Sequence, residues 1–461
     1  MPTSRYLGST AASTIVLLAV LTTIVLSTAA TSSEPLVPPQ WPSFQNGGRR
    51  FLPAGELPIR WTPDENIVWQ ATIEGYGQST PVVDGDQVIV TSTSGAKKNK
   101  YHLTAFELTS GEKLWQQDFD NPSPFENTPM VSRAAPTPVA TQSGYTVFFE
   151  GGVLIGVSKQ GEVHWQRNLV ADYGPITARH GLASSLEQDE RFVFVWVERS
   201  ELPYLVAIDP VDGKTIWKVD GLGATSWSSP RLVPTADGPH LVCSASGKIV
   251  GFDPATGARL WEFTEIANNT SCTPSPIGDG KFLIGASDGR GETSGSPAAA
   301  SNGVIKISKR PDGTYSAAFV WQAEKATSTF GSPVIAGDMA LIVNRTGVLY
   351  RLNLQTGESL SAERTEAGGI WATPLVAGDH LYLFGYKGTT SVVSLSDGKE
   401  LATNRLWVDT KAKTAETGAL GSGASTAGAA FGGGHVLYAA AAAPPFLLLR
   451  RGDTLFAVKA P

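Results

Sequence analysis

A small set of residues in this 461-residue chain has the side chains that catalysis or metal binding requires. The six histidines lie at positions 102, 164, 180, 240, 380 and 435, and they include neither an i, i+4 pair nor an H-E-x-x-H motif. Residues 285–289 match the G-x-S-x-G nucleophile motif, but that motif needs a strand that runs into a helix, and a hairpin loop is expected here. We therefore expect no catalytic residue and no metal site.

Cys243 and Cys272 are the only two cysteines, and they lie 29 positions apart (272 minus 243). In an exported protein they could form one disulfide. The alternative is a pair of small buried residues in neighbouring structural repeats. The sequence does not give the distance between the two side chains, so both interpretations stay open.

Binding chemistry is indicated instead by one position of a repeated motif, three residues before a proline. Its occupants in successive repeats are Gln78, Ala135, Trp227, Ser271, Phe330 and Trp371. Tyr76, Arg133 and His180 lie close by in their own repeats. Exposed aromatic rings with an arginine would suit a peptide or a sugar. The alternative is that these side chains fill a channel or pack beneath a loop.

The element that must position these residues is a hairpin that recurs along the chain. Its clearest copy is LTSGEKLW, which ends in Trp115, and each copy combines a turn glycine with a tryptophan strand. We expect these residues to dock one repeat on the next, since a single repeat cannot bury a core alone. The predicted docking residues are Gly111, Gly161, Gly213 and Gly257, with Trp69, Trp115, Trp165, Trp217, Trp261 and Trp321.

Counting the elements of the repeat predicts the architecture. Small-centred third strands begin near residues 103, 154, 205, 249, 304, 349, 392 and 455, which makes eight. Strands of the tryptophan type that follow a glycine turn number seven, and an unassigned strand of that type lies at residues 66–73. The sequence therefore predicts an all-β, eight-bladed β-propeller of four-stranded antiparallel blades, whose last blade is closed by the N-terminal strand. A seven-bladed ring is the alternative.

The N-terminal residues indicate where the propeller begins and whether the protein is exported, and the net charge excludes some classes of partner. Residues 1–30 resemble a secretory signal peptide, with an uncleaved N-terminal anchor as the alternative. Residues 31–60, with the aromatic cluster Trp41-Pro42-Ser43-Phe44, read as a linker and a segment packed on the outside of the fold, and residues 61–461 as the propeller. The formal net charge of −6 indicates no nucleic-acid partner and no attraction to an anionic membrane.

The glycine–tryptophan turns and the Ser-x-Pro inner strands together resemble the PQQ-like repeat propellers. That group includes quinoprotein alcohol dehydrogenases and the BamB-type outer-membrane assembly scaffold. The opening QWPSFQNGG and the later GQSTPVVDGD are similar to exported PQQ-like repeat proteins of planctomycete type. The dehydrogenases resemble one another in an adjacent cysteine pair and a Glu/Asn/Asp calcium site, and neither has a counterpart in this sequence.

The resemblance implies an exported, non-catalytic scaffold that binds one or more proteins at the cell envelope or in the periplasm. The first alternative is a dehydrogenase of alcohols or sugars that uses the quinone PQQ with calcium. The second alternative is a carbohydrate-binding propeller. The sequence favours the scaffold with no cofactor, and it leaves the oligomeric state and the partner undetermined.

Overall fold

A computed structural model of the chain describes residues 40–49, 57–125, 132–178, 181–199, 202–223, 227–287, 299–407 and 435–461. The chain divides into two compact units, Met1–Val37 and Pro38–Pro461, and all described residues belong to the second. The expected signal peptide at residues 1–30 lies outside the described residues, as do residues 31–39 and 50–56 of the expected linker. Within the described ranges, no helix has the length and apolar character needed to cross a membrane.

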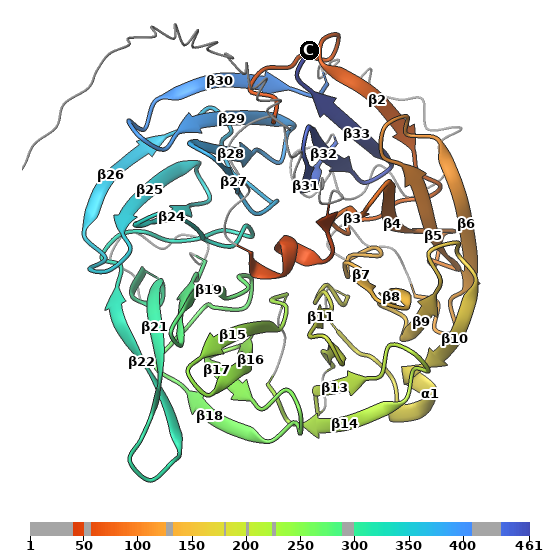
Figure 1. Ribbon diagram of the computed structural model, residues 1–461, viewed down its shortest axis with the longest axis horizontal. Coiled ribbons are helices and arrows are strands. Elements are labelled where there is room, and N and C mark those ends of the chain that lie inside the picture. Colours follow the sequence, from red (N-terminus) through yellow and green to blue (C-terminus); the bar gives the residue numbers. More distant parts are fainter. Residues whose placement is uncertain are drawn as a thin grey trace, which may run out of the picture. The chain divides into compact units, whose positions relative to one another are not determined.

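The described strands of the second unit form eight antiparallel sheets arranged as a ring (Figure 1). The strands of blades 1 to 4 are β3 (Val82–Asp84), β4 (Gln87–Ser94), β5 (Lys100–Glu107) and β6 (Lys113–Asp120); β7 (Val139–Thr141), β8 (Gly144–Phe149), β9 (Val153–Val157) and β10 (Val163–Asn168); β11 (Glu187–Gln188), β12 (Val193–Val197), β13 (Tyr204–Ile208) and β14 (Thr215–Asp220); and β15 (Arg231–Thr235), β16 (Gly238–Ala245), β17 (Lys248–Phe252) and β18 (Arg259–Phe263).

Blades 5 to 8 complete the ring. Their strands are β19 (Ser275–Gly278), β20 (Lys281–Ile284), β21 (Gly303–Lys309) and β22 (Tyr315–Gln322); β23 (Val334–Ala336), β24 (Met339–Val343), β25 (Val348–Asn353) and β26 (Ser359–Arg364); β27 (Leu375–Ala377), β28 (His380–Phe384), β29 (Thr389–Ser394) and β30 (Glu400–Arg405); and β31 (Leu437–Ala443), β32 (Phe446–Arg451), β33 (Thr454–Lys459) and β2 (Ile67–Thr72). Helical turns are limited to η1 (Phe44–Gly48), α1 (Leu169–Tyr173) and η2 (Ala299–Ser301) among the described residues.

Blade 8 is assembled from both ends of the propeller. Its outer strand β2 pairs antiparallel with β33, with Trp69 opposite Ala457 and Thr72 opposite Thr454. This confirms the prediction of eight blades closed by the N-terminal strand, and the seven-bladed alternative is wrong. Because the outer strand of the last blade comes from the start of the chain, the ring is closed by backbone hydrogen bonds rather than by side chains alone.

The core lies between blades. The second and third strands of most blades are buried on both faces, so they read as continuous apolar runs such as Val193–Val197 and Tyr204–Ile208. The cluster that joins blades 1 and 2 shows the principle, because it combines Ile89 and Leu103 of one blade with Val147 of the next. Each blade therefore completes its neighbour's core, which explains why a single repeat could not be stable alone.

Five of the predicted tryptophans pack on the turn glycine of the following blade. A Cβ added at Gly111 would lie 2.6 Å from the ring of Trp69, so no other side chain fits there. The indole Nε1–H of Trp69 also donates to the carbonyl oxygen of Leu108, at 2.9 Å. The same arrangement pairs Trp115 with Gly161, Trp165 with Gly213, Trp217 with Gly257 and Trp321 with Gly357.

Three of the eight blade interfaces depart from this pattern. Between blades 7 and 8, the outer strand β30 (Glu400–Arg405) contains no tryptophan. The other two place different contacts there. Trp261 packs on Gly251 of its own blade and donates to Nδ1 of His240 at 3.0 Å, because the corresponding turn of blade 5 lies at the end of the long β21–β22 hairpin. Between blades 6 and 7, Arg351 covers Gly398 and donates to the carbonyl oxygen of Leu395. An arginine thus takes the place of the indole.

The N-terminal segment corrects one expectation. Trp41 pairs with Val83 of the innermost strand of blade 1, and the turn η1 that follows lies in the centre of the ring (Figure 1). The prediction of a segment packed on the outside is therefore wrong for residues 40–49. Residues 57–61 do contact the outer part of blade 7, where the backbone N–H of Trp61 donates to Asn404 at 2.9 Å.

Candidate functional site

The inner edge of the ring is bound together by hydroxyl groups. In each of blades 1 to 6, a serine or threonine just before the inner strand donates its backbone N–H to the hydroxyl oxygen of its counterpart in the next blade. The described bonds run from Thr80 N–H to Thr137 (3.0 Å), Thr137 to Ser185 (3.0 Å), Ser185 to Ser229 (2.9 Å), Ser229 to Thr273 (2.9 Å), Thr273 to Ser332 (2.9 Å) and Ser332 to Thr373 (3.3 Å). We call this series the hydroxyl belt.

The predicted aromatic positions meet in space beside the belt. The rings of Trp227 and Phe330 lie 5.8 Å apart, and those of Phe330 and Trp371 stack at 4.6 Å. Trp371 meets Tyr438 edge-on at 5.5 Å, and Tyr438 meets Tyr76 edge-on at 5.9 Å. These five side chains form one continuous series, which we call the aromatic arc. It spans blades 4, 6, 7, 8 and the start of blade 1, so no single repeat contains it.

Arg133 extends the aromatic arc at its blade 1 end. Its guanidinium carbon lies 5.0 Å from the ring centre of Tyr76, and the side chain is only 1% exposed. Burial lowers the pKa of Arg133 and raises the pKa values of Tyr76 and Tyr438, so both phenols are neutral at physiological pH. The hydroxyl groups of Tyr76 and Tyr438 are 2.7 Å apart and share one hydrogen bond.

The structure places five of the six predicted channel-mouth residues in this one region, and His180 lies outside the described residues. Sequence reasoning missed Tyr438. The inner strand of blade 8 is the alanine-rich Leu437–Ala443, which lacks the Ser-x-Pro signal used to align the other repeats. If the inner strands had been aligned by the turn that follows them, here the β31–β32 turn, the inner strand of blade 8 would have been included and Tyr438 identified.

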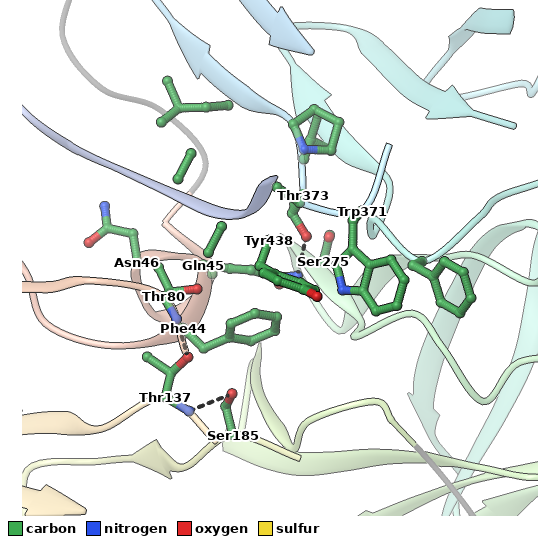
Figure 2. Close-up of a pocket in the computed structure, with 18 of the residues that line it drawn as sticks. Phe44, Gln45, Asn46, Thr80, Thr137, Ser185, Ser275, Trp371, Thr373 and Tyr438 are labelled. Atoms are coloured by element: carbon green, nitrogen blue, oxygen red, sulfur yellow. Dashed lines mark hydrogen bonds between the residues drawn. The ribbon is translucent and has the colours of Figure 1, made fainter. Parts of the chain in front are cut away.

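A cavity of about 220 Å³ lies inside the ring, between the aromatic arc, the hydroxyl belt and η1 (Figure 2). Trp227, Phe330, Trp371 and Tyr438 contribute aromatic surface. Hydroxyl and amide groups contribute the polar surface, from residues that include Gln45, Asn46, Gln78, Thr80, Thr137, Ser185, Ser275 and Thr373. Of the described residues that line the cavity, Arg49 alone is charged, and it is exposed.

Residues 40–49 are held in the channel by several blades at once. Gln45 donates through Nε2 to the hydroxyl groups of Ser332 and Thr373, at 2.9 Å each. Arg231 donates to the carbonyl oxygen of Phe44 at 3.1 Å and pairs with the buried Glu187 at 2.9 Å. Burial raises the pKa of Glu187, and the charge of Arg231 opposes that rise. The segment therefore forms a fixed wall of the cavity.

Comparison with known proteins identifies the family. The family model described as "Outer membrane protein assembly factor BamB" matches residues 55–175, 177–401 and 301–443. The chain belongs to the BamB family. BamB of Shewanella oneidensis is 21% identical over 336 residues, which cover 72% of this chain and 65% of that protein. BamB of Alkalilimnicola ehrlichii is 27% identical over 218 residues, covering 46% of this chain. The chain thus spans 65% and 50% of the lengths of these two BamB proteins.

Solved structures show the same fold at low identity. The crystal structure of BamB from Moraxella catarrhalis aligns with a TM-score of 0.53 at 14% identity, covering 85% of this chain and 96% of that one. A europium-containing methanol dehydrogenase aligns with a TM-score of 0.55 at 11% identity, covering 80% of this chain and 86% of that one. Both similarities show the propeller fold, which the family match identifies as a PQQ-like repeat propeller, and neither shows an activity.

The described residues that line the cavity do not provide the ligands expected for a calcium-bound quinone. Cys243 and Cys272 are both free and buried, and burial raises the pKa of Cys272 to about 12. Within the described residues, no group of three His, Cys, Asp or Glu side chains could hold a metal ion. The described lining of the cavity contains no carboxylate, so it offers calcium only neutral oxygen atoms.

Proposed function

We propose that this BamB-family chain is a non-catalytic scaffold of the cell envelope that binds a protein partner at the mouth of its channel. Four BamB proteins match the sequence, and their name describes outer membrane protein assembly factors. Residues 1–30, read as an export signal, support a location beyond the cytoplasmic membrane. The partner would then be another protein of the envelope.

The observation that carries this proposal is the aromatic arc. Trp, Tyr and Arg are the residue types that contribute most binding energy at protein interfaces, and here they gather beside the cavity inside the ring. Trp227, Phe330 and Trp371 are only partly buried, so part of each ring is available to a partner. Their positions are fixed by the inner strands and the hydroxyl belt, which keeps the ordering cost of binding low.

The experiment compares two double variants of the tagged full chain in its own host. Trp227→Ala with Trp371→Ala removes the centre of the aromatic arc, and Leu114→Ala with Leu360→Ala removes apolar side chains that are 47% and 53% exposed on the outer strands. Cross-linked envelope proteins are quantified by mass spectrometry, after urea unfolding has shown that both variants fold. We expect at least a tenfold loss of the specific partner in the first variant and no loss in the second.

Equal recovery of the partner by both variants would exclude the aromatic arc as the binding surface. Cell fractionation gives a separate test of location. Recovery of the chain in the cytoplasm, with its N-terminal residues intact, would contradict the envelope assignment.

We also propose that the chain works without a quinone. The purified protein is incubated with PQQ and calcium, and the quinone absorbance and the reduction of an artificial electron-accepting dye are recorded with alcohols and sugars. We expect neither a retained quinone spectrum nor dye reduction. A stoichiometric bound quinone would overturn this part of the proposal and restore the dehydrogenase alternative.

A further inference from the structure

Three polar side chains of blade 1 are hydrogen-bonded in the order serine, histidine, aspartate. The hydroxyl oxygen of Ser94 lies 2.8 Å from Nε2 of His102, and Nδ1 of the same ring lies 2.8 Å from Oδ1 of Asp118. The three residues belong to the adjacent strands β4, β5 and β6 (Figure 1). Because each residue comes from a different strand, no local motif in the sequence marks the group.

The register of the three strands brings these side chains together. His102 lies directly opposite Asp118, and Ser94 lies opposite Lys100, two residues before His102. Side chains that are opposite each other in an antiparallel sheet share a face, and so do side chains two residues apart. All three therefore lie on one face of blade 1. Nε2 of Gln116 donates to Oδ1 of Asp118 at 2.9 Å, which holds the carboxylate in place.

The carboxylate of Asp118 determines which ring nitrogen of His102 carries the proton. Burial raises the pKa of Asp118, but hydrogen bonds from His102 and Gln116 lower it by more, so the pKa is below its usual value. An ionised carboxylate only accepts hydrogen bonds, so Nδ1 carries the proton. In the neutral ring, Nε2 is then unprotonated and accepts from the hydroxyl group of Ser94. A histidine in this arrangement can take the proton of a serine while the serine oxygen attacks.

Ser94 also lies where a reagent from solvent can approach. The ring of His102 is 2% exposed, so it is held in one orientation. Ser94 itself is only partly buried, at the end of β4, and Gly95, which follows it, is exposed. The base is thus fixed inside the blade, while the end of the strand that carries the nucleophile is open.

The charges around the group favour one kind of reagent. The side chains of Asp118 and Glu74 are 52% and 56% exposed, and Oε1 of Glu74 lies 3.9 Å from Nε2 of His102. The nearby Lys100 is paired with Asp120. The unbalanced charge is therefore negative, and it would repel an anionic reagent most strongly at low ionic strength. An uncharged reagent meets no such repulsion.

We propose that Ser94 is a nucleophile that accepts an acyl group from an uncharged activated ester. Its Oγ attacks the carbonyl carbon, the hydroxyl proton passes to Nε2 of His102, and the bond from that carbon to the leaving group breaks. His102 gives the proton to the leaving group, so the products are an ester on Ser94 and a neutral alcohol. Asp118 is a positioning residue, since it acts through His102. This inference goes beyond the proposed scaffold function, because it concerns one covalent modification of blade 1 without turnover.

The test uses the full-length chain and a fluorophosphonate probe, which bonds to a nucleophilic serine with loss of fluoride. Ser94→Ala, His102→Gln and Asp118→Asn each remove one member of the group. Ser110→Ala is the matched control, because Ser110 is an exposed serine between β5 and β6 whose hydroxyl accepts from the backbone N–H of Glu112. Intact-protein mass spectrometry follows the labelling, after urea unfolding has shown that each variant folds.

We expect one probe on each chain, labelling at least tenfold slower in Ser94→Ala and His102→Gln, and unchanged labelling in Ser110→Ala. The wild-type rate should rise with pH as His102 loses its proton and then level off. Asp118→Asn should label more slowly and move the midpoint of that rise to lower pH, because a carboxylate that stabilises the charged ring is lost while Glu74 remains. An unlabelled wild type would overturn the inference, as would labelling that Ser94→Ala does not slow.

A second measurement does not depend on the folding of any variant. Peptide mapping of the labelled wild type must place the adduct on Ser94, and an adduct on another residue would overturn the inference. The 4-nitrophenyl esters of butyrate (neutral) and succinate (anionic) are then compared at low ionic strength, each relative to its rate with free imidazole. The neutral ester should acylate Ser94 faster, and equal relative rates would overturn the preference for an uncharged donor. The scaffold proposal is tested independently, since its partner is recovered or lost by variants of Trp227 and Trp371 without any acyl donor.

Discussion

The circumference of the ring and its channel are built by opposite rules. On the circumference, one contact recurs with little variation: the tryptophan of one blade lies on the turn glycine of the next, as Trp115 does on Gly161. In the channel, the hydroxyl belt repeats, but the position three residues before the inner-strand proline varies from blade to blade. Contacts there also join residues that are far apart in sequence. Gln45 and Thr373, for example, are 328 positions apart and hydrogen-bonded. Repetition thus supplies stability, and variation supplies the surfaces on which a ligand or partner could be recognised.

The irregular interface between blades 4 and 5 adds to this contrast. Where the long hairpin of blade 5 removes the docking turn, Trp261 bonds to His240 instead of to a backbone carbonyl oxygen. A carbonyl oxygen does not titrate near neutral pH, whereas an imidazole does. This irregular contact therefore makes a titratable side chain the partner of a docking tryptophan, within blade 4.

The largest effect should come from the docking glycines. Gly161 and Gly313 both have φ of 86°, but a Cβ at Gly161 would lie 2.7 Å from Trp115 while a Cβ at Gly313 would meet nothing within 4 Å. Gly161→Ala should lower the free energy of unfolding by about 3 kcal/mol, from overpacking and backbone strain together. Gly313→Ala should cost about 1 kcal/mol from strain alone. Urea unfolding followed by tryptophan fluorescence measures both, and equal losses would show that the docking contact imposes no steric limit.

A smaller loss is expected from the hydroxyl belt on the inner edge. Thr273→Val keeps the shape of the side chain but removes the acceptor of the Ser229 backbone N–H, which is then buried without a partner. The expected cost is about 1–2 kcal/mol. Thr256→Val is the control, because its hydroxyl bonds to Asp253 on an exposed turn, and it should change stability by less than about 0.5 kcal/mol. Indistinguishable urea midpoints for the two variants would indicate that the belt does not stabilise the ring.

The smallest effect should be the pH dependence of the hydrogen bond between Trp261 and His240, both of blade 4. Burial lowers the pKa of His240, against the opposing charges of Asp253 and Asp237, and Nδ1 must be unprotonated to accept from Trp261. Below about pH 6.5 the unfolded chain takes up a proton that the folded chain binds less readily, so stability should fall as the pH falls. His240→Asn keeps an acceptor and does not titrate.

The free energy of unfolding of the wild type and of His240→Asn, measured from pH 7.5 to 5.5, checks this prediction. The wild type should lose more stability than the variant over that range. Parallel curves would show that the titration of His240 does not contribute to the pH dependence of stability.

The sequence predicted the blades well because the signals are local. A turn glycine with positive φ and a tryptophan a few residues later mark one hairpin, and the eight third strands were found close to their observed positions. The site was predicted only in part. Trp227, Phe330 and Trp371 could be aligned through the following proline, whereas Tyr438 follows no such signal, and nothing local indicates that Trp41 enters the channel.

By itself, then, the sequence determined the number of blades and the closure of the last one, since hairpin geometry and the count of strands fix both. Only the tertiary structure decided that residues 40–49 lie inside the ring, and that aromatic side chains from different blades form one series beside a neutral cavity. The physical reason is the distance along the sequence between the residues that interact. A hairpin is specified by the conformational preferences of a few consecutive residues, but the channel is specified by contacts between residues brought together only when the ring closes.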